Sequence, residues 1–250
     1  MNEPRRYRDF AYHGARYRIA SPRAEIIIEE IKRVRAALEA YIARHPDFRD
    51  SLVPVDVAAD APPVARRMAE AARAAGVGPM AAVAGALAQA AAERALEAGA
   101  EEAIVDNGGD VFMVSPRPVV TGVYAAAGRL SGRLAFLVRP EEMPLSLCAS
   151  SGVMGHSFSR GECELAVAAA ANAALADAAA TLAANLVSKP EDLANALDTV
   201  GKIPGIRGVF VLMGDAVGMN GSLPELVRHA DGMLTKKIPA HKSWRGIITM

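Results

Sequence analysis

The sequence predicts an α+β protein in which helices pack on antiparallel sheet. Two observations support this class. Aromatic and apolar runs flank short glycine-containing turns at His13-Gly14 and Gly108-Gly109, as in β-hairpins. Alanine-rich stretches with helical spacing lie between such runs. With 250 residues, the chain is long enough for one large domain or two small ones.

Composition is that of an ordinary globular protein and excludes several classes of partner. The chain is 52% hydrophobic and 22% charged, and its formal net charge is +0. This balance argues against nucleic acid or an anionic membrane as the main partner. No secretory signal is expected, and the apolar stretches are too interrupted for a membrane span. Cys148 and Cys163 lack zinc-ligand spacing and suit a reducing compartment, so we expect a cytoplasmic protein.

The first third of the chain is predicted as strands followed by three helices. Residues 6–29 are interpreted as strands, with "RYRDFAYHGARYRI" forming a hairpin and "AEIIIE" following it. Glu29 to His45 has helical spacing and stops before Pro46. Pro62-Pro63 opens a second helix that Gly76 can end. A third helix runs from about Met80 to Glu97, with Gly99 in its C-terminal cap.

The remainder alternates between strands and helices. "EEAIVDNGGDVFMV" is predicted as strand, tight turn and strand, and "TGVYAAA" and "GRLAFLV" as further strands. Residues 140–161 are predicted as loop. An alanine block over 165–187 follows, in which periodicity alone does not separate strand from helix at Glu164 to Ala169. A short helix from Pro190, the strand "RGVFVLMGD" and a mixed tail containing Trp244 complete the chain.

The sequence contains a weak internal echo. "AVAGALAQAAAE" from Ala82 resembles "AVAAAANAALAD" from Ala166. Each is followed, at unequal distance, by an apolar strand that ends in Gly-Asp. Alanine richness alone can produce such a match. If the echo reflects a repeat, the fold is a duplicated unit of helices packed on a sheet.

Asp177 and Thr181 are the polar residues that stand out in the alanine block. On a helix they share a face because they are four residues apart. One interpretation is a local hydrogen bond from Thr181 to the carbonyl of Asp177. The other is a hard cation such as Mg²⁺, for which a carboxylate and a hydroxyl supply two oxygen ligands. The spacing leaves both interpretations open.

Two glycine-containing segments are candidates for contact with a ligand. "DNGGD" places two glycines where a strand turns, and glycine lets a ligand approach the backbone closely. An ordinary hairpin turn is the alternative. "GVGPM" precedes a helix whose free amides can hold a phosphate, although it lacks the ending of a phosphate-binding P-loop. No lysine occurs between Lys32 and Lys189, so an anion bound here needs amides, arginine or metal.

The segment "SSGVMGHS" carries Ser150, Ser151, Gly152 and His156 on one glycine-rich loop. The Gly-x-Ser-x-Gly pattern of serine hydrolases is absent, which argues against that class. His156 is the one histidine of the central region and therefore the natural candidate for a general base. A structural role in the loop is the alternative.

Taken in order, these motifs resemble the ApbE-like superfamily, whose type activity is FAD:protein FMN transfer. The matching segments are "GPMAAVAGALA", "IVDNGGD", the serine-glycine step 150–152, "GH" at 155–156 and "ADAAAT". They follow the family's order from about residue 78 to residue 187. The last motif is the most specific. The resemblance implies a T-fold-like α+β fold of duplicated antiparallel sheet-and-helix units, in one domain over 1–250 with two related halves.

The resemblance also implies a chemistry and a set of site residues. Asp177 and Thr181 match the positions that bind magnesium in the family, with a backbone carbonyl from residues 81–84. The family splits FAD between its phosphates and moves FMN onto a threonine of an acceptor protein. His156 or a carboxylate would take the hydroxyl proton. The positions expected to contact the flavin nucleotide are Gly78, Asn107, Gly108, Gly109, Asp110, Ser150, Ser151 and Gly152.

Three departures from the family pattern keep a second function open. The family's lysine in the Gly/Ala-rich helix start falls at about Ala84. "SFSRG" follows His156 in place of the family's Asp-Pro…Thr-Gly stretch. Many members are exported, whereas this chain is expected to belong to a cytoplasmic branch of the family. The alternatives are a magnesium-dependent enzyme that transfers FMN or hydrolyses the FAD pyrophosphate, and a non-catalytic flavin- or nucleotide-binding protein with a degraded transferase site.

Overall fold

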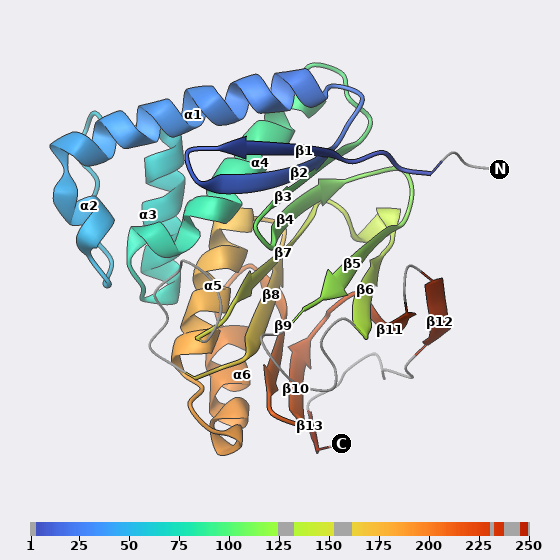
Figure 1. The fold of residues 1–250 in the computed structure, drawn as a ribbon. Helices are drawn as coiled ribbons and strands as arrows, with labels where there is room; N and C mark the ends of the chain where they lie inside the picture. Colours follow the sequence, from blue (N-terminus) through green and yellow to red (C-terminus); the bar gives the residue numbers. More distant parts are fainter. Residues whose placement is uncertain (1–3, 125–132, 153–161, 231–232, 238–245, 250) are drawn as a thin grey trace.

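The computed structural model describes residues 4–124, 133–152, 162–230, 233–237 and 246–249 (Figure 1). The α-helices are α1 (Ala24–Arg44), α2 (Pro46–Asp50), α3 (Pro63–Ala75), α4 (Val83–Glu97), α5 (Ala173–Asn185) and α6 (Leu193–Gly201). Short 3₁₀ helices are η1 (Pro79–Ala82), η2 (Pro140–Glu142) and η3 (Pro190–Asp192). The strands are β1 (Arg8–Tyr12), β2 (Ala15–Ala20), β3 (Ala103–Asn107), β4 (Asp110–Val114), β5 (Val119–Val123), β6 (Leu134–Val138), β7 (Leu145–Ser150), β8 (Leu165–Ala170), β9 (Ile206–Met213), β10 (Ala216–Gly221), β11 (Glu225–Ala230), β12 (Met233–Lys237) and β13 (Gly246–Thr249).

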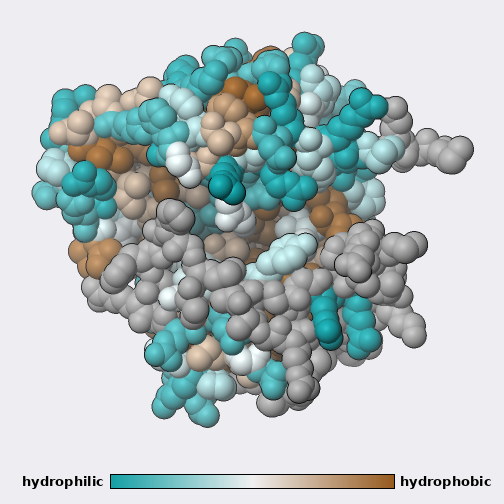
Figure 2. All heavy atoms as spheres, in the orientation of Figure 1, coloured by the Kyte–Doolittle hydropathy of each residue, from teal (hydrophilic) through white to brown (hydrophobic). Residues whose placement is uncertain are grey.

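Within the described residues the strands form two antiparallel sheets. The larger has nine strands in the order β1-β2-β3-β4-β7-β8-β9-β10-β13, and the smaller has four in the order β12-β11-β6-β5. In Figure 1 the helices cover one face of the large sheet and the small sheet lies on the other. The α+β class with helices on antiparallel sheet is therefore confirmed. Figure 2 shows mainly hydrophilic atoms on the face drawn there, with hydrophobic atoms in small patches.

The two faces of the large sheet have different cores. Between the sheets lie bulky side chains such as Phe136 and Phe210, whose rings meet edge to face at 5.8 Å. On the helix side, β8 and α5 meet through alanines, including Ala166, Ala168 and Ala180. Small side chains allow a helix to pack close to the sheet. As a result, the few polar side chains of α5 are held near the strands below them.

Local signals account for several elements. His13 and Gly14 both have positive φ (45° and 82°) in the β1–β2 turn, and Gly108 and Gly109 do so (70° and 110°) in the β3–β4 turn. Both are two-residue turns of the kind that Asn, His and Gly favour. Gly76 ends α3 in the left-handed conformation, as expected. The strand over 165–170, ambiguous by periodicity, is β8.

Two sequence expectations are wrong. "AEIIIE" is the beginning of α1 instead of a strand, because its buried isoleucines continue a helical stripe, at Ile27, Ile28 and Ile31. The segment 140–161, predicted as loop, contains β7, a strand inside the large sheet whose serines are buried together with its apolar residues. The tail, left without assignment, supplies strands to both sheets. Trp244 lies outside the described residues.

The internal echo does not align equivalent elements. Its first copy lies in η1 and α4, whereas its second copy runs from β8 into α5. Shared alanine content explains such a match, and the duplication stays a prediction. Among the described helices, none alone has the length and apolar character to cross a membrane, although the α3 and η1–α4 segments, bent by 104°, pass that test as a pair.

Candidate functional site

A row of polar side chains crosses the helix-covered face of the large sheet. Asn107 pairs with Asp110 across the β3–β4 turn. The β4–β7 register puts Asp110 opposite Cys148, which in turn pairs with Ala168 on β8. Residues directly opposite one another share a face of a sheet. Cys148 packs among residues of α1, α4 and α5, so the whole row lies beneath the helices.

Asp177, on α5, lies close enough to this row to interact electrostatically with Asp110 and Cys148. Its Oδ2 accepts a hydrogen bond from the backbone N–H of Gly85 at 2.9 Å, in the first turn of α4. The adjacent carbonyl of Ala84 accepts a bond from the Asn107 side-chain amide at 3.2 Å. A Cβ on Gly85 would lie only 2.3 Å from the carbonyl oxygen of Ala173. Glycine at 85 is thus what allows α4 and α5 to approach so closely.

The electrostatics of this cluster are unusual for a protein interior. Burial raises the pKa of Asp177 well above its usual value, and the negative charge of Asp110 raises it further. Burial likewise raises the pKa of Asp110 to about 7, against the lowering effect of the Ala149 amide. The thiol of Cys148 has its pKa raised by burial and by both carboxylates. Two carboxyl groups that oppose each other's ionisation form a site that a cation or a proton would stabilise.

The two aspartates of the "DNGGD" turn accept hydrogen bonds from backbone N–H groups. Asp106 accepts a hydrogen bond from the Gly109 N–H at 2.9 Å, which closes the turn on itself. Asp110 points the other way and accepts the Ala149 N–H at 3.2 Å, which joins β4 to β7. A Cβ on Gly108 would meet no atom within 4 Å. The backbone at Gly108 is thus open to a ligand, as the glycines of the motif suggested.

The serines of the next motif lie at the end of β7. Ser151 Oγ donates to the carbonyl of Cys163 at 3.2 Å, and the Gly152 N–H reaches the same carbonyl at 2.8 Å. Ser150 Oγ is buried and has no hydrogen-bond partner among the described residues. Since side chains alternate along a strand, Ser150 lies on the same face as Cys148. An unpartnered buried hydroxyl there suits a polar ligand.

Three predicted site residues remain: Thr181, Gly78 and His156. Thr181 lies one turn beyond Asp177 on α5, and each is only 7% exposed. Within the described residues the structure gives the Thr181 hydroxyl no hydrogen bond, so the local bond to the Asp177 carbonyl is not made. Gly78 precedes η1, where a Cβ would lie 1.9 Å from the Ser51 carbonyl, so packing already explains that glycine. His156 lies outside the described residues.

Sequence reasoning missed three participants. The sequence motifs give no separate role to Gly85, and the cysteine spacing gives none to Cys148. Gln89 is the third: its side-chain oxygen accepts the N–H of Ala173 at 2.7 Å, at the beginning of α5. The sequence does contain an indication of its role. A single glutamine in an alanine-rich helix, like a single aspartate, needs a polar partner if it is buried. Partners for such residues come from distant segments, which the sequence does not identify.

The donor set fits a hard divalent cation better than a soft one. Asp177 and Thr181 share a face of α5, and Asp110 is close enough to Asp177 to influence its ionisation. These are carboxylate and hydroxyl oxygens, which Mg²⁺ prefers. Among the described residues no three His, Cys, Asp or Glu side chains form a metal-binding group. A cation here would therefore depend on hydroxyl, main-chain or substrate oxygens as well.

A hollow of about 490 Å³ lies elsewhere, between the end of α1, α2 and the chain that follows it. Its lining residues are Tyr41, Arg44, His45, Pro46, Asp47, Phe48, Val55, Asp56, Val57 and Ala58. It contains none of the predicted site residues. Chemistry and geometry both favour the Asp110–Asp177 cluster as the functional site.

Comparison with known proteins finds relatives over most of the chain. Residues 18–203 match the family model described as AbpE bacteria. A UPF0280 protein of Methanocella arvoryzae is 43% identical over 211 residues, which cover 84% of this chain and 86% of the relative. A UPF0280 protein of Methanocaldococcus jannaschii is 39% identical over 205 residues, covering 80% of this chain and 83% of the relative.

Two solved structures share the fold at low sequence identity. The apbe protein of Thermotoga maritima has a TM-score of 0.56 and 15% identity, covering 83% of this chain and 94% of that protein. The flavin transferase ApbE of Vibrio cholerae has a TM-score of 0.54 and 12% identity, covering 86% and 96%. At this level of identity the likeness concerns the fold.

Proposed function

The chain belongs to the family described as AbpE bacteria, and from this premise we propose that it acts on flavin nucleotides. The proposed reaction is magnesium-dependent transfer of FMN from FAD to a threonine of an acceptor protein, with water as the acceptor when no protein is present. The name flavin transferase, which the Vibrio cholerae protein carries, supports this choice.

One observation carries the proposal: three motifs far apart in the sequence meet at Asp177. Its carboxylate is bonded to the Gly85 amide in the Gly/Ala-rich helix start, and it interacts electrostatically with Asp110 of the "DNGGD" motif. A buried carboxylate in an alanine helix is costly unless a partner stabilises it. Backbone amides of Gly85 and Ala84 offset part of that cost, but the pKa of Asp177 stays well above its usual value. A cation shared with a phosphate-bearing ligand would offset the rest of the cost of burying this carboxylate.

In the proposed reaction the acceptor oxygen attacks the phosphorus on the FMN side of the FAD pyrophosphate. A new P–O bond forms, the bond from that phosphorus to the bridging oxygen breaks, and AMP leaves with the electron pair. The acceptor's proton passes to a base of the protein. His156 is the expected base. Asp110 is the carboxylate alternative, since its pKa of about 7 suits proton exchange near neutrality.

Other groups of the chain would bind and orient the substrate. Asp177 and Thr181 would hold magnesium, which neutralises pyrophosphate charge when bound. Ser150 offers a hydroxyl without a partner among the described residues, and the open backbone at Gly108 allows close approach of a ligand. No lysine lies between Lys32 and Lys189, so backbone amides, arginines or the cation would have to stabilise the phosphate charge.

The test is to incubate purified protein with FAD, with Mg²⁺ or with EDTA, and to separate AMP and FMN by chromatography. The enzyme proposal expects equal amounts of AMP and of free or protein-bound FMN, in the presence of Mg²⁺ only. FAD binding without AMP release would favour the alternative, a non-catalytic binding protein, for which Ala84 in place of the family's lysine is the supporting observation. A protein that neither binds FAD nor releases AMP would overturn both proposed functions.

His156→Ala separates the two functions further. An enzyme that uses this histidine as its base should lose about 10²–10⁴-fold in rate while still binding FAD. A binding protein has no rate to lose. An unchanged rate in His156→Ala would transfer the role of base to a carboxylate, and Asp110→Asn would then be the variant to measure.

A further inference from the structure

We propose that Gln89 is a positioning residue that holds the first turn of α5 against α4 and so keeps Asp177 at the Gly85 amide. The inference rests on the proposed function for its consequence in binding, and on the contacts of Gln89 for its geometry. Gln89 belongs to none of the motifs that point to flavin chemistry. It is only 9% exposed.

The side chain of Gln89 is used at both of its polar atoms. Oε1 accepts the backbone N–H of Ala173, the first residue of α5, at 2.7 Å. Nε2 donates to Oε1 of Glu93 at 2.8 Å, one turn further along α4. Both Nη atoms of Arg67, on α3, bond the other carboxylate oxygen of Glu93 at 3.0 Å. A continuous chain of polar contacts therefore joins α3 and α4 to the beginning of α5.

Ala173 is held by α4 at two points. Its N–H is bonded to Gln89, and its carbonyl oxygen packs against the Cα of Gly85, where a Cβ would come within 2.3 Å. Gly85 and Gln89 are four residues apart and share a face of α4. The Gly85 amide is also the donor to Asp177. The same face of α4 thus contacts both Ala173 and the carboxylate one turn later.

The beginning of α5 offers a matched comparison. Asn172 caps the helix, and its Oδ1 accepts the N–H of Leu175 at 3.1 Å. That bond lies within one segment and moves with the helix. The bond from Gln89 connects residues of two helices that are 84 positions apart in the sequence. Loss of either bond removes a partner from a helix N-terminus, but only the second bond connects α5 to α4.

A purely structural role is the competing explanation, in which Gln89 only satisfies a buried N–H. The structural and the positioning role predict different effects of Gln89→Leu relative to Asn172→Ala. A structural role predicts a similar fall in stability from both and nothing specific at Asp177. Positioning predicts that only the Gln89 variant disturbs the Gly85–Asp177 contact.

The first measurement is hydrogen exchange at the Gly85 amide, followed by NMR in the protein without added ligand. We expect Gln89→Leu to speed exchange at Gly85 by about tenfold or more, and Asn172→Ala to leave it within about twofold of wild type. The double variant Gln89→Glu, Glu93→Gln exchanges carboxylate for amide, keeps an acceptor for Ala173 and should restore protection. If Gln89→Leu does not fold, Gln89→Asn, which is too short to reach Ala173, replaces it.

The second measurement is FAD binding titrated with Mg²⁺. Gln89→Leu should raise the Mg²⁺ concentration for half-maximal binding by about tenfold, while Asn172→Ala leaves it unchanged. Equal effects of the two variants on Gly85 exchange, or protected Gly85 in Gln89→Leu, would overturn the positioning role. If wild-type protein shows no Mg²⁺-dependent FAD binding, the proposed function fails, and the amide measurement still decides the role of Gln89.

Discussion

The backbone amide of Gly85 donates a hydrogen bond of 2.9 Å to Oδ2 of Asp177, across 92 residues of sequence. The bond joins the first turn of α4 to the middle of α5 and is buried. It gives the aspartate of the alanine helix a partner. A glycine stands at 85 because a Cβ there would lie 2.3 Å from the Ala173 carbonyl oxygen.

Asp177→Asn should abolish Mg²⁺-dependent FAD binding without unfolding the protein. The amide oxygen of asparagine can still accept the Gly85 N–H, but the variant has no charge to attract a cation. Because the native carboxylate is buried beside Asp110, its loss should leave the melting temperature at pH 7 unchanged or higher. Calorimetry of FAD binding and thermal unfolding check the two parts. Retained Mg²⁺ dependence would remove Asp177 from the metal site.

Asp110→Asn should stabilise the protein more at neutral pH than in acid. Burial raises the pKa of Asp110 to about 7, so the folded state favours the protonated form. Stability is therefore lost as pH rises from about 4, the unfolded pKa, through about 7. The difference in unfolding free energy between variant and wild type should grow over that window and level off above it. Urea titrations at several pH values measure it, and a flat difference would contradict the shift.

Gly85→Ala should destabilise the protein, although alanine is the better helix former. Helix propensity alone predicts a gain of about 1 kcal/mol. The new Cβ would lie 2.3 Å from the Ala173 carbonyl oxygen, and relieving that overlap should cost about 1–3 kcal/mol. Ala90→Gly, on the same helix, is the control for propensity. The sign of the change in urea unfolding decides between the two effects.

Neither cysteine should react with a thiol reagent in the folded protein. Burial and the two carboxylates raise the pKa of Cys148, and burial raises the pKa of Cys163 to about 12. Thiolate is the reactive form, so both thiols stay inert at pH 8. A disulfide-exchange reagent should detect both thiols in denaturant and neither without it. Fast labelling at Cys148 would show that the site opens readily, and Cys148→Ser assigns the signal.

Arg5→Leu should cost about 1–3 kcal/mol of unfolding free energy. Arg5 and Glu102 side chains are each 14% exposed and joined at 2.8 Å, and Ser115 donates to the same carboxylate. Burial alone would raise the pKa of Glu102, but these bonds and nearby arginines lower it instead. The cost of Arg5→Leu should therefore shrink as Glu102 becomes protonated in acid.

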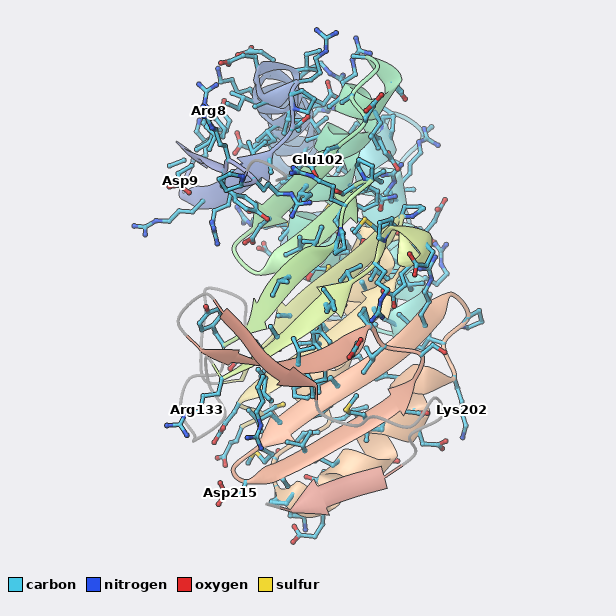
Figure 3. All side chains as sticks on the ribbon, turned by 90° about the vertical axis from the view of Figure 1, so that its right-hand side faces the viewer. Arg8, Asp9, Glu102, Arg133, Lys202 and Asp215 are labelled. Carbon is cyan, nitrogen blue, oxygen red and sulfur yellow. The ribbon has the colours of Figure 1, made fainter. Side chains whose placement is uncertain are left out.

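Arg8→Leu is the control for that prediction. Arg8 pairs with Glu25, but their side chains are 51% and 74% exposed, so this pair should contribute about 0–1 kcal/mol. In Figure 3 Arg8 and Asp9 project from the edge of the sheet, while Glu102 lies further in on its surface. Equal costs for the two arginines would show that the Arg5 contact has no special role.

Sequence by itself determined the features that depend on neighbouring residues. The turns at His13-Gly14 and Gly108-Gly109, the end of α3 at Gly76 and the end of α1 before Pro46 follow from backbone preferences that act over a few positions. The ordered motifs also sufficed to indicate the family and its fold. Local preference failed at the isoleucines that begin α1, where β-branched side chains suggested a strand and burial of a helical stripe prevailed.

Only the tertiary structure decided which polar residues meet. The chain brings Asp110, Cys148 and Asp177 together from two strands and a helix. From a fourth element, α4, Gln89 bonds the first residue of that helix, although it belongs to no recognised motif. A buried polar side chain in the sequence indicates that a partner exists, because burial without one is costly. It does not say which partner, since hydrogen bonding and electrostatic interaction depend on distance in space, which strand register and helix packing set.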